Sequence, residues 1–155
     1  MKVFLEEARE ELKRADHLIY VSLKYTRTVD VIKSVIERLI SCLDFTIDKL
    51  LAHAVEEKLI SEKPSNAGLK CNALKKAYGD VFGEMVSFYL LMRNISRAEY
   101  KKSSEYRRHF TMTATTDEGI HAIDIDKAKE LFFKVRQFVE DAEKLINGEE
   151  AEEDS

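Results

Sequence analysis

The chain has 155 residues, about the size of one compact domain. Its residues are 45% hydrophobic and 35% charged, which provides enough apolar surface for a core and argues against global disorder. It holds five Gly and one Pro, and neither type occurs before Pro64. This excludes a fold of many short strands over the first 63 residues, because such folds need frequent turn residues.

Apolar residues recur at spacings of three and four along most of the chain, and this period predicts amphipathic helices. The expected helices cover about residues 3–24, 29–61, 69–77, 81–95 and 125–146. Thr28 is the expected N-cap of the long second helix, and Asp124 is the expected N-cap of the last one. We therefore expect an all-α fold, an antiparallel four- to five-helix up-and-down bundle.

One domain is expected over residues 1–148, followed by a disordered acidic tail at 149–155, which holds five acids and no base. The stretch from 97 to 119 is polar, basic and rich in threonine, and its pattern fits a helical extension, a loop or both. Its threonines are typical of an extended connector.

The chain carries two cysteines, Cys42 and Cys71, too few for a disulfide framework, and both fall within helical pattern. We expect them to be reduced, buried thiols. The N-terminal residues 1–5 run at once into Glu6 and Glu7, so the hydrophobic region of a signal peptide is not expected, and no uncharged stretch approaches the ~20 residues that cross a bilayer. The expected protein is soluble and cytoplasmic, without a membrane partner.

Positive charge is concentrated between Arg93 and His109, where six bases stand among two acids and two tyrosines. If this segment stays helical, its bases form a stripe that attracts phosphate oxygens, and its tyrosines offer stacking surfaces for unpaired bases. A solvated helix face is the alternative interpretation. The candidate nucleic-acid contacts are Arg93, Arg97, Tyr100, Lys101, Tyr106, Arg107 and Arg108, with His109 as a hydrogen-bonding group.

Arg93 and Asn94 stand at the end of an apolar helix, and the chain also has a long second helix and the segments at 97–100 and 106–109. By these features it resembles the HEPN superfamily, including a group of archaeal proteins of that kind. The resemblance implies a helical bundle that dimerises. It also implies one of two roles, either a metal-independent ribonuclease or the partner of a minimal nucleotidyltransferase in a toxin–antitoxin pair.

Catalysis in this superfamily uses an Arg, often followed by Asn, and a His four to six residues further on. The required positions hold Ala98, Glu99 and Tyr100, so the motif is incomplete. A tyrosine hydroxyl keeps its proton at neutral pH and does not replace an imidazole as general base. If the protein is a ribonuclease, Arg93, Asn94 and His109 are its expected catalytic residues, with His109 brought to Arg93 by folding or across a dimer.

Apolar residues outside the main stripes predict a second buried face. Phe132 and Phe133 are adjacent and cannot both face one core, which favours a homodimer. The sequence lacks the paired Glu-x-x-His motifs of ferritin-like metal centres, the phosphate loop and the dinucleotide fingerprint, so we expect neither a metal nor a cofactor.

These observations favour an RNA- or nucleotide-binding module that is non-catalytic or weakly catalytic and uses residues 93–109. Two alternatives stay open. One is a metal-independent endoribonuclease of the HEPN type, and the other is a protein partner of a nucleotidyltransferase with no affinity of its own for nucleic acid.

Overall fold

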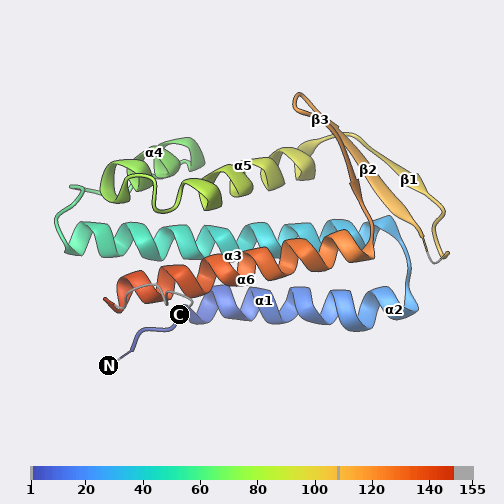
Figure 1. Ribbon diagram of the computed structural model, residues 1–155, viewed down its shortest axis with the longest axis horizontal. Helices are drawn as coiled ribbons and strands as arrows, with labels where there is room; N and C mark the ends of the chain where they lie inside the picture. The colour runs from blue at the N-terminus through green and yellow to red at the C-terminus, as the bar shows by residue number, and fades with distance from the viewer. Residues whose placement is uncertain (1, 108, 149–155) are drawn as a thin grey trace, which may run out of the picture.

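The computed structural model describes residues 2–107 and 109–148, which form helices joined to one small sheet (Figure 1). In chain order the elements are α1 (Glu6–His17), a π-helix η1 (Leu18–Ser22), α2 (Leu23–Tyr25), α3 (Val29–Glu56), α4 (Ala67–Tyr78), α5 (Gly83–Arg97), β1 (Tyr100–Ser103), β2 (Thr111–Thr116), β3 (Gly119–Ile123) and α6 (Ile125–Ile146).

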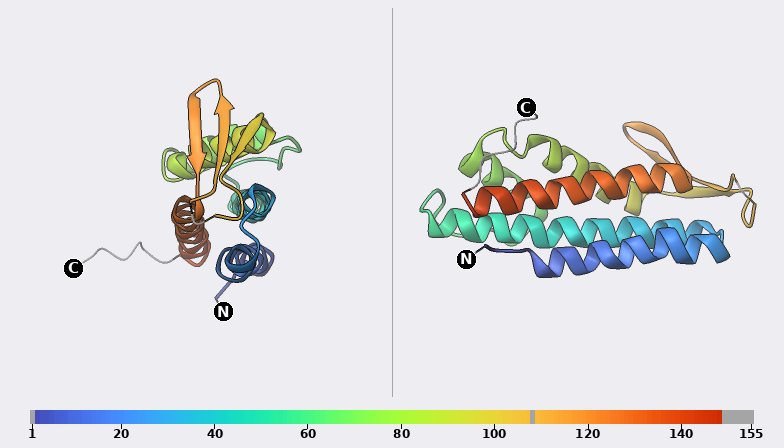
Figure 2. Two further views of the ribbon diagram at one scale, coloured as in Figure 1. Left: turned by 90° about the vertical axis from the view of Figure 1, so that its right-hand side faces the viewer. Right: turned by 60° about the horizontal axis from the view of Figure 1, so that its bottom comes forward.

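The long helix α3 is the centre of the fold and contacts α1, α4, α5 and α6. It lies beside α1 and α6, while α4 and α5 cover another side of it (Figures 1 and 2). The apolar stripe of α3 is fully buried, including Leu39, Leu43 and Leu50. Helices α3 and α6 run in one direction, and α1 and α5 run in the other.

The apolar periodicity predicted the helices well, and most of their ends have a local cause. Asp124 caps α6 as expected, because its side chain accepts a hydrogen bond of 2.8 Å from the N–H of Lys127. Thr28 occupies the N-cap position of α3 but makes no capping bond with its side chain. Helix α3 ends at Glu56, earlier than predicted, and Lys58 follows in a left-handed conformation.

The all-α prediction is wrong, because residues 100–123 form a three-stranded antiparallel sheet in the order β1-β2-β3. The sheet stands at one end of the helices, between α5 and α6 in the sequence. The fold is therefore mixed, with helices and one antiparallel sheet. A β-branched, alternating segment explains the difference, since Met112 and Ala114 are fully buried while Thr113 and Thr115 face away from the core.

The two cysteines are free and buried, as predicted. Burial raises the pKa of the Cys42 thiol to about 12 and also raises the pKa of Cys71. Neither thiol is therefore an effective nucleophile at neutral pH.

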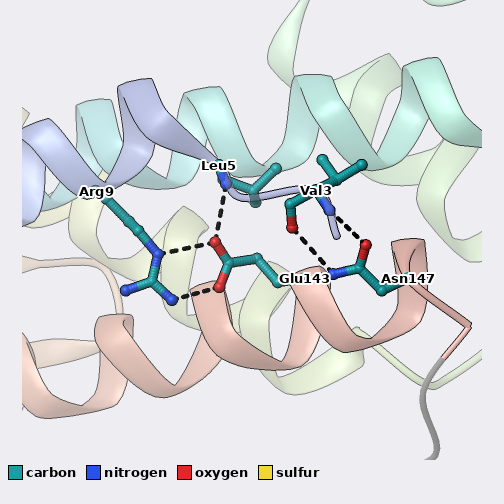
Figure 3. A network of polar contacts seen from close by, with 5 residues as sticks. All are labelled: Val3, Leu5, Arg9, Glu143 and Asn147. Carbon is teal, nitrogen blue, oxygen red and sulfur yellow. Dashed lines mark hydrogen bonds and ion pairs between the residues drawn. The ribbon is translucent and has the colours of Figure 1, made fainter. Parts of the chain in front are cut away.

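The two ends of the described chain meet at the opposite end of the molecule from the sheet (Figure 3). Glu143 of α6 accepts hydrogen bonds from the N–H of Leu5 and from the guanidinium of Arg9. The side-chain amide of Asn147 accepts a bond from the N–H of Val3 and donates one to its carbonyl, at 2.7 and 3.0 Å. These contacts hold the segment before α1 against the end of α6.

Among the helices that the structure describes, none combines the length and the apolar character that crossing a membrane requires.

Candidate nucleic-acid interface

The basic segment does not form the single helical stripe considered above. Helix α5 ends at Arg97, which lies four residues after Arg93 on the same helix face, but Lys101 already lies in β1 and does not continue that face. Arg97 and Lys101 are exposed, whereas Arg93 is partly buried. Arg108 lies outside the described residues.

Arg93 belongs to a polar group between α5 and α3. Its guanidinium carbon lies 5.5 Å from the centre of the Tyr89 ring, and Nη1 donates to the Tyr89 hydroxyl at 3.3 Å. That hydroxyl donates in turn to Asp44 at 2.5 Å. Burial, together with the bond to Asp44, raises the pKa of Tyr89, so the phenol stays protonated and joins the two charged groups. Asn94 follows on α5 and is exposed.

The inner side of β1 is held to α3 by paired charges. The Tyr100 ring lies 5.1 Å from Lys33 Nζ, and the Tyr100 hydroxyl donates to Asp30 at 3.5 Å. Lys102 lies 3.4 Å from Asp30 and 3.7 Å from Glu105, and the charge of Asp30 is the main reason that the pKa of Lys102 is raised. Tyr100 and Lys102 therefore have partners within the chain and serve to position β1.

The loop between β1 and β2 presents a different arrangement at Tyr106. This residue has a φ of 65°, an uncommon left-handed conformation for a bulky side chain, and 74% of its surface is exposed. Its N–H donates to the carbonyl of Arg27 at 2.7 Å, and the N–H of Arg107 donates to the carbonyl of Ser104 at 3.1 Å. The loop is thus tied to the connection between α2 and α3 while the side chains of Tyr106 and Arg107 stay exposed.

The connection between α2 and α3 carries the same residue types. Tyr25 is 78% exposed, and Lys24 Nζ lies 5.9 Å from the centre of its ring. Arg27 is half-buried and Arg107 is exposed, and the side chain of neither makes an ion pair in the part of the chain that the structure describes. We call the residues Lys24, Tyr25, Arg27, Tyr106 and Arg107 the aromatic–basic surface.

Sequence reasoning found only half of this surface. It singled out Tyr106 and Arg107, but it placed Lys24 at the end of the first helix and gave Tyr25 and Arg27, in the connection before the second helix, no functional role. The alternation of bases with a tyrosine is a signal common to both segments. What the sequence does not contain is the contact between Tyr106 and Arg27, which joins segments about 80 residues apart.

The π-helix η1 leads directly into this surface. It places Tyr20 and Val21 on the exterior, and Lys129 of α6 lies 5.3 Å from the centre of the Tyr20 ring. A π-helix replaces the regular hydrogen-bonding period of an α-helix and occurs often at functional sites. Here it adds a third exposed tyrosine to the same run of the chain, and α6 places Lys129 beside that tyrosine.

His109 lies in another environment. It lines a hollow of about 220 Å³ with Asp124, Ile125 and Asp126 at the start of α6. The contacts of Arg93 are with Tyr89 on α5, so the described structure does not join the two residues in one site. No group of three or more His, Cys, Asp or Glu side chains within residues 2–107 and 109–148 is arranged to hold a metal ion.

The comparisons with known proteins found no matching family model, no matching curated protein and no matching solved structure. The resemblance to the HEPN superfamily therefore stays a prediction.

Proposed function

We propose that this protein binds single-stranded RNA through the aromatic–basic surface and does not cleave it. The observation that carries the proposal is the pairing of two well-exposed tyrosines, Tyr25 and Tyr106, on separate segments joined by a main-chain hydrogen bond. Arg107 directly follows Tyr106 and Arg27 follows Tyr25 by two residues, each without a carboxylate partner among the described residues.

Exposed rings of this kind are suited to stacking on bases. A base stacked on an aromatic side chain contributes about 1–3 kcal/mol to binding, and every base offers a π-face. The left-handed conformation of Tyr106 supports the same interpretation, since it accompanies the main-chain bond to Arg27 and an exposed ring, and residues in sparsely populated backbone regions cluster at functional sites.

The neighbouring bases supply the electrostatic part of the interaction. Guanidinium groups bind phosphate oxygens in a two-pronged geometry, and both Arg27 and Arg107 are available for this contact. Paired bases of a duplex do not expose their faces, so stacking on Tyr25 and Tyr106 favours single strands. The proposal is limited to binding because Arg93 and His109, the candidate ribonuclease pair, lie in separate surroundings.

The test is the affinity of the protein for a short, fluorescently labelled oligouridylate, measured by anisotropy beside a duplex of the same length. The double variant Tyr25→Ala, Tyr106→Ala is expected to weaken binding to the single strand at least about tenfold. Phe4→Ala is the matched control, because Phe4 is exposed and lies between Val3 and Leu5, which are bonded to the far end of α6. Equal affinity for both probes, or an unchanged affinity of the double variant, contradicts the proposal.

A salt titration of the same complex tests the electrostatic part. Each phosphate contact on a single strand contributes about 0.7 to the slope of log affinity against log salt concentration, so Arg27→Ala, Arg107→Ala is expected to lower the slope by about 1.4. Lys76→Ala, an exposed base of α4, is expected to leave the slope unchanged. A slope that is the same in all three proteins contradicts a role for the two arginines.

A further inference from the structure

The π-helix η1 changes which residues of the first helical segment lie on the same side. The N–H of Leu23 donates to the carbonyl of Leu18, five residues earlier. An α-helix completes a turn in 3.6 residues, so two residues five apart would point in directions about 140° apart. The wider turn of a π-helix, with its bonds between residues five apart, returns such residues to one side of the axis.

The burial of the side chains agrees with this change of period. Leu18 and Leu23 both pack against the core, although they are five residues apart. Tyr20 and Tyr25 each follow one of these leucines by two residues, so they share another side of the segment. Both are exposed there, Tyr20 over 43% of its surface. The π-helix therefore places two exposed tyrosine rings one turn apart on the same side.

The ring of Tyr20 has one contact that fixes its position. Lys129 Nζ of α6 lies 5.3 Å from the centre of the ring, and the two groups attract each other by a cation–π interaction. The Tyr20 hydroxyl makes no hydrogen bond, and Lys129 has no carboxylate partner, among the residues that the structure describes. Lys129 is thus a positioning residue, and it leaves the ring partly open to solvent.

The charges around Tyr20 differ from those around Tyr25 and Tyr106. Asp16 stands one turn before Tyr20 on α1, and Asp126 stands three residues before Lys129 on α6. Both carboxylates are exposed, and neither makes an ion pair within residues 2–107 and 109–148. Since carboxylates repel phosphate, a strand that reaches Tyr20 gains stacking there but no added phosphate contact.

We propose that Tyr20 is a third base-stacking position, which follows Tyr25 and Tyr106 and sets the substrate class as RNA with at least three consecutive unpaired nucleotides. This inference rests on the proposed binding of single-stranded RNA at the aromatic–basic surface. Each of the three rings takes one base, and the bases belong to one continuous strand. Hairpin loops and single-stranded ends offer such a run, whereas one bulged base in a duplex reaches a single ring.

The test is a length series of labelled oligouridylates, from two to eight nucleotides, with affinity measured by anisotropy. Tyr20→Ala is expected to weaken binding at least about fivefold for probes of three or more nucleotides, which is the loss of one stacked base. The dinucleotide is expected to lose little, because it still occupies Tyr25 and Tyr106. Tyr20→Phe keeps the ring and is expected to bind every probe as the parent protein does.

Val21→Ala is the matched control for a disturbance of the π-helix, because Val21 is the next residue of η1 and is 42% exposed. It is expected to bind like the parent protein at every length, and circular dichroism of each variant checks the fold. A salt titration adds a second measurement. The slope of log affinity against log salt concentration is expected to be the same for Tyr20→Ala and the parent protein, since no phosphate contact is lost.

The outcomes separate this inference from the proposed function on which it rests. Binding that depends on Tyr25 and Tyr106 but is unchanged in Tyr20→Ala at every length overturns the third position and leaves the proposed function intact. A loss in Tyr20→Phe or Val21→Ala equal to that in Tyr20→Ala, or a reduced salt slope in Tyr20→Ala, also overturns it. Absence of binding by the parent protein to every probe overturns both.

Discussion

The carboxylate of Glu143 is buried near the end of α6, where it accepts hydrogen bonds of 2.8 Å from the N–H of Leu5 and from Nε of Arg9. A second guanidinium nitrogen of Arg9 pairs with its other oxygen. Burial by itself raises the pKa of Glu143, but the hydrogen bonds from Arg9 and Leu5 and the charge of Arg9 outweigh it, so the pKa lies below its ordinary value.

Glu143→Gln is expected to lower the free energy of unfolding by about 2 kcal/mol, because the charged hydrogen bonds are lost while Arg9 stays half-buried. Urea denaturation measures this difference. Glu130→Gln on the same helix is the control, since Glu130 pairs with Lys127 on the surface and its loss costs at most about 0.5 kcal/mol. Equal effects of the two substitutions contradict a structural role for the Glu143 network.

The lowered pKa of Glu143 also predicts a dependence of stability on pH. Below the ordinary carboxyl value of 4.5 the unfolded chain binds a proton that the folded chain resists, so the contribution of Glu143 is present above this value and is lost as the pH falls below it. The difference in unfolding free energy between the parent protein and Glu143→Gln is therefore expected to shrink with acidification. Urea titrations of both proteins, from neutral pH to below 4.5, measure it, and a constant difference contradicts the assignment.

At the scale of elements, the N-caps of α3 and α6 provide a matched pair. Asp124 makes a capping bond and Thr28 makes none, although both occupy the same position before a long helix. Asp124→Ala is expected to cost about 1 kcal/mol and Thr28→Ala clearly less. Urea denaturation of both variants measures the difference. A larger cost at Thr28 contradicts the assignment of the cap.

The helices were predictable because each carries its own signal, a stripe of apolar residues with a period near 3.6. The stripe of Ile32, Leu39 and Leu43 needs only local sequence to be recognised, and all three residues are buried. Their ends were less predictable, since α3 ends at Glu56 through a left-handed residue that composition does not mark.

The sheet was not predictable in the same way because its strands have four to six residues and depend on pairing between distant positions. In β2 only Met112 and Ala114 show the alternation of apolar and polar residues that marks a strand, and the intervening threonines are compatible with an extended connector. The aromatic–basic surface was also only partly predictable, because it depends on a contact between distant positions. Tyr106 was found from its basic surroundings, but Tyr25 joins it only through the bond between Tyr106 and Arg27.

At the scale of the whole molecule, the two ends differ, and the proposed function assigns binding to only one of them. The Glu143 network holds the chain termini at one end, and the aromatic–basic surface lies at the end that carries the sheet (Figure 1). Stability and binding are therefore expected to respond to different residues. Substitution of Glu143 is expected to change the unfolding free energy, while the proposed affinity for RNA is expected to change on substitution of Tyr25 and Tyr106.

The most direct measurement of the central claim is photo-cross-linking of the full chain to a single-stranded RNA that carries photoreactive uridine, followed by mass spectrometry of the cross-linked peptides. Binding at the aromatic–basic surface predicts cross-links to Tyr25 and Tyr106, which disappear when excess unlabelled single strand competes. Cross-links confined to α4 or to the chain termini, or no cross-linking above that of a protein without RNA affinity, would contradict the claim.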